Sequence, residues 1–115
     1  MSSMSIAPKL VKHTTVSSSS SLNIDASKFN VVDVVLTEAS ELMPPTNQIN
    51  GSKVEWRIKA SGANRDVTIN TDIIIPSSAT VTSPVTINDG DTTLFMLEYN
   101  ESLAKWMLIA YIEGY

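Results

Sequence analysis

The stretch Lys53-Val-Glu-Trp-Arg-Ile-Lys59 decides the fold class of this chain. Its apolar residues alternate strictly with charged ones, which is the period-two pattern of a strand with one buried and one solvated face. The dipeptide Asn50-Gly51 just before it favours a turn, because both residues tolerate positive φ. The stretch therefore predicts a strand that packs one face against a core.

Working outward, the neighbouring segments have the same character. β-Branched and aromatic residues, which favour strands, are dense in four further segments: Phe29–Leu36, Asp66–Ile75, Thr92–Tyr99 and Ala104–Ile112. A shorter segment, 81–87, carries Pro84, which predicts an edge strand or the start of a strand. We expect the final strand to be covered on both faces, since it has apolar residues on each; a central position or a subunit contact would explain this.

Helix has little support in the sequence. Only residues 37–43 tolerate it, and seven residues are marginal without tertiary help. With turn signals roughly every 10 residues, the pattern predicts an all-β fold, a compact antiparallel sandwich or barrel-like domain with an extended N-terminal arm.

The first 28 residues differ in chemistry from the rest. Ser17–Ser21 is an uninterrupted serine run, which favours flexibility. Scattered apolar residues in the same region suggest an arm that orders against a partner, while a frayed terminus with one strand added to the sheet is the alternative. The predicted division is an extended Ser/Thr-rich arm over residues 1–28 and a β-domain over 29–115. The predicted partner-binding residues of the arm are Ile6, Leu10, Val11 and Val16.

Composition limits the function classes. The chain has 115 residues, no cysteine and a net charge of -4, so disulfides, thiolate zinc sites and cysteine nucleophiles are excluded. Nucleic acid is an unfavourable partner, because phosphate binding needs concentrated Lys and Arg. No apolar stretch reaches 18 residues and the N-terminus lacks the apolar segment of a secretion signal, so we expect neither membrane insertion nor export.

No combination of polar residues predicts catalysis or a cofactor. His13 is the single histidine and lies among flexible flanks that would not hold a nucleophile and its base in place. Asp89 and Asp91 flank Gly90, where a hairpin turn explains them as well as a calcium ion does, and the bidentate Glu of a calcium loop is missing. The pair Glu98 and Glu101 is more typical of solvated surface than of a glycosidase. We expect no enzyme, no metal and no cofactor.

Both tryptophans are predicted to be core residues. Trp56 lies on the apolar side of its strand and Trp106 lies in a strongly apolar one. Each buries on the order of 200 Å², which is a large share of a small core. A role in stacking on sugar rings would require exposed aromatic side chains instead.

Several of these segments resemble a small β-domain of tailed-phage virion proteins, found in capsid cement (decoration) proteins and in fibre tips. The resemblance is carried by Asn50-Gly51, Ala60-Ser61-Gly62, Val67-Thr68-Ile69, and the C-terminal residues Gly90, Leu97–Asn100 and Lys105–Leu108. It covers roughly 29–115. These are turn and core positions, which many sheet proteins can satisfy.

The resemblance implies a structural role in the virion. A fibre tip normally follows a shaft, and the sequence has no heptads or Gly-X-Y repeats before the domain, which favours a cement protein. The expected partner is then the major capsid protein, bound on the capsid exterior by a homotrimer made in the host cytoplasm. A tail-fibre or receptor-binding module that recognises host carbohydrate is the alternative.

Overall fold

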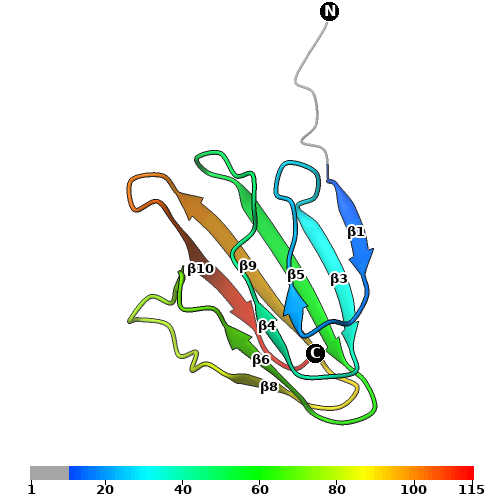
Figure 1. Ribbon diagram of the computed structural model, residues 1–115. Helices are drawn as coiled ribbons and strands as arrows, with labels where there is room; N and C mark the ends of the chain where they lie inside the picture. The colour runs from blue at the N-terminus through cyan, green and yellow to red at the C-terminus, as the bar shows by residue number, and fades with distance from the viewer. Residues whose placement is uncertain (1–10) are drawn as a thin grey trace, which may run out of the picture.

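The computed structural model describes residues 11–115, and within them every regular element is a strand (Figure 1). A six-stranded sheet has the order β1-β3-β5-β9-β10-β7 and a four-stranded sheet has the order β2-β4-β6-β8. The larger sheet comprises β1 (His13–Val16), β3 (Val31–Leu36), β5 (Lys53–Ala60), β9 (Thr92–Asn100), β10 (Lys105–Ile112) and β7 (Ile73–Ile74). The smaller comprises β2 (Ser21–Leu22), β4 (Ser40–Leu42), β6 (Arg65–Ile69) and β8 (Val85–Ile87).

From β1 to β6 the chain alternates between the two sheets. We call each successive pair of strands a coil: 13–22, 31–42 and 53–69. The coils stack in parallel, with β3 between β1 and β5 in one sheet and β4 between β2 and β6 in the other. After the third coil antiparallel pairs appear: β8 runs antiparallel to β6, and β9 runs antiparallel to both β5 and β10. β7 pairs in parallel with β10 at the edge of the larger sheet.

The expectation of an antiparallel sandwich or barrel is therefore wrong. Both sheets are mixed, and five of the eight strand pairings among the described residues are parallel. The reason lies in the connections. After β3 the chain crosses to the other sheet, forms β4 and returns to the starting end before β5 begins, so β5 must run in the same direction as β3.

The extended arm is also wrong for residues 13–22. β1 pairs with β3 in one sheet and β2 pairs with β4 in the other, so this segment is the first coil. The serine run between them turns the corner from sheet to sheet and is fixed to the second coil. The Thr37 N–H donates to Ser18 Oγ at 3.0 Å, and the Glu41 N–H donates to the Ser20 carbonyl at 3.0 Å.

A single core lies between the sheets. Its largest fully buried side chains are Trp56 and Phe95 from the larger sheet, with Leu22 and Leu42 among those from the smaller. The two tryptophan predictions are confirmed, since Trp56 is fully buried and Trp106 is only 2% exposed.

The predicted strand 66–75 proves to be two strands. β6 and β7 belong to different sheets, and the chain turns between them where the Ile73 N–H donates to the Asn70 carbonyl at 2.9 Å. The helix-tolerant segment 37–43 contains β4 instead, because Ser40 and Leu42 face the core and pair with β6.

Candidate docking surface

One end of the molecule presents three large apolar side chains to solvent. It is formed by the start of β1 and by the loops that precede β3, β5 and β10, all at the top of Figure 1. Val11 is 71% exposed, Ile49 is 76% exposed and Leu103 is 52% exposed. We call these three residues the apical row and this end of the molecule the apical end.

Ile49 is held on a closed turn. Its N–H donates to Ser52 Oγ at 2.9 Å, and its carbonyl accepts from the Ser52 N–H at 3.0 Å. Gly51 supplies the positive φ of 81° that the turn requires, and its N–H donates to the Tyr99 carbonyl at 3.1 Å. The Ile49 backbone is thereby anchored to the end of β9.

Leu103 is held in a similar way by the β9–β10 turn. Its N–H donates to Asn100 Oδ1 at 3.2 Å, and the adjacent Glu101 N–H donates to Asn50 Oδ1 at 3.1 Å. The second bond joins the Leu103 turn directly to the Ile49 turn. These two apolar side chains therefore have a shared backbone support.

Val11 lies where the chain enters the sheet. The neighbouring Lys12 exchanges two hydrogen bonds with Asn30, at 2.8 Å to the Asn30 side chain and at 2.9 Å from the Asn30 N–H. All three residues of the apical row thus stand on or beside hydrogen-bonded backbone. Such preorganisation lowers the entropy cost of burying these side chains against a partner.

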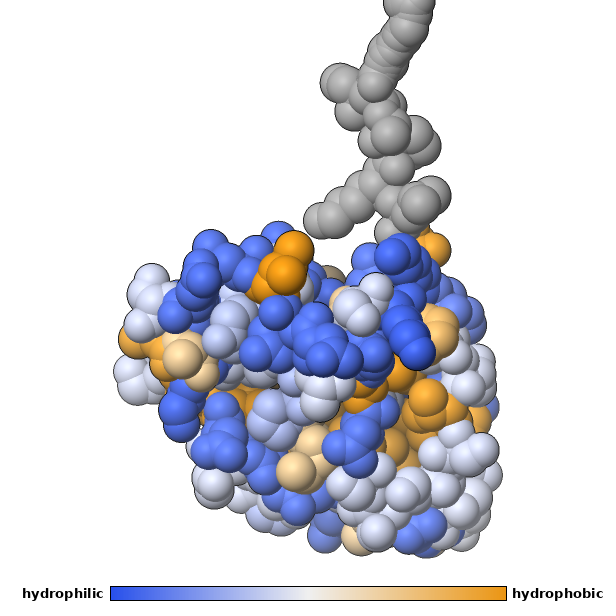
Figure 2. All heavy atoms as spheres, turned by 45° about the horizontal axis from the view of Figure 1, so that its top comes forward, coloured by the Kyte–Doolittle hydropathy of each residue, from blue (hydrophilic) through white to orange (hydrophobic). Residues whose placement is uncertain are grey.

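The space-filling view shows this end turned toward the reader. Apolar atoms form separate patches on a mostly hydrophilic surface (Figure 2). Separate apolar patches among polar groups are typical of transient protein–protein interfaces, whereas obligate interfaces are more continuously apolar.

Charge divides the two ends of the molecule. Around the apical end lysines and acids are mixed, and hydrogen bonds from Ser27 lower the pKa of Asp25, which keeps that carboxylate ionised. The opposite end carries more acids than bases, with Lys59 and Arg65 set against five acidic residues: Glu38, Asp66, Asp89, Asp91 and Glu113.

The predicted contact residues have different fates. Ile6 and Leu10 lie outside the described residues. Val11 is on the surface as a contact requires, whereas Val16 packs against the core from β1. Ile49 and Leu103 were missed; the available signal was a large apolar residue beside an Asn-containing turn, where nothing local can bury it.

The polar candidates form no catalytic arrangement among residues 11–115. On the outer face of the larger sheet, Asp33 accepts hydrogen bonds from Arg57 at 2.8 Å and contacts His13 Nε2 at 2.5 Å. The hydrogen bonds from Arg57 are the main reason that the pKa of the Asp33 carboxyl is lowered. The group joins β1, β3 and β5 and contains no nucleophile.

The other acidic candidates have structural partners. Asp89 Oδ1 accepts from the Gly62 N–H at 3.0 Å, and the Asp89 N–H donates to Asn64 Oδ1 at 2.9 Å, so Asp89 joins two turns. A Glu98 carboxylate oxygen, Oε2, lies 3.6 Å from Lys53 Nζ and forms an ion pair with it. The described residues contain no cluster of three or more metal-ligating side chains.

The outer face of β10 is open in the single chain. Ile109 is 42% exposed and Ile112 is 52% exposed, so the expected cover on both faces is not supplied by residues 11–115. The subunit contact stays a prediction.

Comparison with known proteins gives information on the fold alone. No protein-family model matches the chain, and no curated protein matches it. Among solved structures, a chain described as "Structure of a chaperone-substrate complex" is similar with a TM-score of 0.55 and 16% identity over 91% of this chain. This chain covers 19% of that chain. The class defined by fold and surface is a small domain of two mixed sheets with a preorganised apolar end.

Within residues 11–115 there is no helix with the length and apolar character needed to cross a bilayer.

Proposed function

We propose that the protein is a structural, non-catalytic component of a virion that attaches to the exterior of a phage capsid through its apical end and stabilises the shell. The observation that carries this proposal is the apical row, three exposed apolar side chains of which two, Ile49 and Leu103, stand on turns joined by a hydrogen bond. The resemblance of the sequence to cement proteins supplies the capsid as the partner.

Charge supports the orientation. The acid-rich end lies opposite the apical row, so docking by the apical end leaves these acidic groups in solvent. Docking by the other end would remove several carboxylates from water at once, which is costly.

A homotrimer follows from the same proposal. The exposed Ile112 at the end of β10 is the surface we assign to contact between copies. A trimer that matches the shell symmetry presents three apical rows at once, so the second and third contacts form at high effective concentration. Modest individual contacts then suffice for firm attachment.

The test uses capsid shells, assembled from the major capsid protein encoded in the same genome, that lack this protein. The triple variant Val11→Ser, Ile49→Ser, Leu103→Ser should lose most of its attachment in a sedimentation assay. Val35→Ser is the matched control, because Val35 is 49% exposed but lies on the outer face of β3. Equal attachment of the triple variant and the control would overturn the apical assignment, and no attachment by the unaltered protein would overturn the function.

A further inference from the structure

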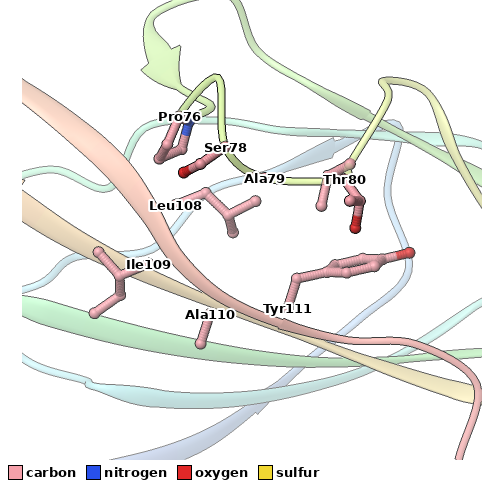
Figure 3. A pocket seen from close by; sticks show the side chains of 9 residues that line it. Pro76, Ser78, Ala79, Thr80, Leu108, Ile109, Ala110 and Tyr111 are labelled. Carbon is pink, nitrogen blue, oxygen red and sulfur yellow. The ribbon is translucent and has the colours of Figure 1, made fainter.

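A groove lies between β10 and the loop 75–84 that follows β7. It has a volume of about 350 Å³ and is lined by loop residues 76 and 78–81 and by β10 residues 108–111 (Figure 3). A second hollow of about 210 Å³ adjoins it and shares Thr80, Val81 and Tyr111. The Tyr111 side chain therefore borders both hollows.

A β-bulge places Tyr111 there. The register of β10 against β9 shifts between Leu108 and Ala110, so Tyr111 stands opposite the buried Phe95. Strict alternation from Leu108 would have turned Tyr111 to the outer face. The two rings are tilted at 57° with centroids 5.5 Å apart, so Phe95 supports the tyrosine ring from the core side. Figure 3 shows the Tyr111 ring lying under the Ala79–Thr80 segment.

The loop that closes the groove is fixed in place. The Ile69 N–H donates to Ser83 Oγ at 2.8 Å, and the Ala79 N–H donates to the Pro76 carbonyl at 2.9 Å. The first bond ties the loop to β6, and the second closes a turn within the loop.

Hydroxyl groups and one carboxylate surround the ring. Ser78, Thr80 and Thr82 are exposed, and each is both a donor and an acceptor. Glu113 lies beside Tyr111, and burial with this neighbour raises the pKa of the tyrosine hydroxyl, which keeps it protonated as a donor. No Lys or Arg is among the residues that line either hollow, which disfavours phosphate or other anions.

We infer that this groove binds a short neutral saccharide. A tyrosine at the boundary of two hollows can pack against the C–H groups of a sugar ring, and the surrounding hydroxyls and carboxylate match the alternating donors and acceptors of sugar hydroxyls. Two adjoining hollows that share one aromatic residue fit linked sugar units better than a single compact molecule. The site is separate from the apical row and does not depend on attachment to a capsid.

The experiment is an NMR titration of the full chain with neutral di- and trisaccharides built from glucose, galactose, mannose or N-acetylglucosamine. We expect saturable shifts confined to amides of residues 77–82 and 108–113 for at least one saccharide. Tyr111→Ala should weaken that binding by at least about tenfold, equivalent to about 1.4 kcal/mol. Tyr111→Phe, which keeps the ring and the fold, should stay within about threefold.

Tyr115→Ala is the matched control, since Tyr115 is 57% exposed and lines neither hollow. It should bind like the unaltered protein. No shift with any saccharide up to about 20 mM, or binding that Tyr111→Phe and Tyr111→Ala leave equally unchanged, would overturn the inference.

Discussion

Asp33 on β3 and Arg57 on β5 occupy the same register position and are joined by two hydrogen bonds of 2.8 Å. Because the strands are parallel neighbours, this pair and the His13 contact connect the three coils along the outer face of the sheet.

Asp33→Asn tests the contribution of this pair to stability. Arg57 lowers the folded-state pKa of Asp33, so the stabilisation is complete above the unfolded pKa of about 3.9 and is lost as the pH falls through the folded pKa. The side chain is 37% exposed, and solvent screening limits the effect to about 1 kcal/mol or less. Urea unfolding at pH 7 and pH 3 should show a smaller loss on acidification for the variant. An unchanged pH dependence would contradict the assignment.

Thr93→Val should stabilise the protein. Thr93 is fully buried opposite Ile58, and its hydroxyl has no hydrogen-bond partner among the described residues. A buried hydroxyl without a partner costs about 1–3 kcal/mol, and valine has nearly the same shape without the hydroxyl. We expect a gain of about 1 kcal/mol in urea unfolding. Thr93→Ser, which keeps the hydroxyl and loses a methyl, should be less stable than the original.

Ser18→Ala tests whether the serine run is a structured corner. The substitution removes the acceptor of the Thr37 N–H and should cost about 1 kcal/mol. The direct readout is amide hydrogen exchange, in which Thr37 should lose protection. Ser17→Ala is the control, because Ser17 is exposed in the same run. Equal protection of Thr37 in both variants would show that the corner is not held by this bond.

Two N-terminal deletions distinguish the first coil from an arm. Deleting residues 1–28 removes β1, β2 and the core residues Leu22 and Ile24. Compared with deletion of residues 1–10, it should lower the free energy of unfolding by at least about 4 kcal/mol, given 2–5 kcal/mol for one buried leucine. Similar stability of the two deletions would mean that the first coil is dispensable, as an attached arm would be.

The sequence predicted which residues face the core far better than it predicted how strands pair. Strict alternation in 53–59 identifies Trp56 as buried whichever direction its neighbours run, because periodicity depends on the strand itself. Parallel pairing depends on where the chain goes between strands, and the intervening β2 and β4 have two and three residues, too few to show a period. The serine run gave no sign of the first coil, because serine side chains fix this corner by hydrogen bonds and contribute no apolar pattern to the sequence.

The candidate surfaces were only partly accessible from sequence. Val11 was predicted as a partner-binding residue, but Ile49 and Leu103 lie together only because two turns distant in sequence are bonded through Asn50. Tyr111 was expected in a strand covered on both faces. The position of Tyr111 in a groove depends on a bulge at Ile109, and no local residue pattern predicts that bulge.

Attachment by the apical end can be seen in a cryo-electron microscopy reconstruction of a decorated shell. We expect density in groups of three, with Ile49 and Leu103 against the shell and the Asp89 turn facing solvent. Density that places the Asp89 turn against the shell, or a shell that stays bare at saturating protein, would contradict it.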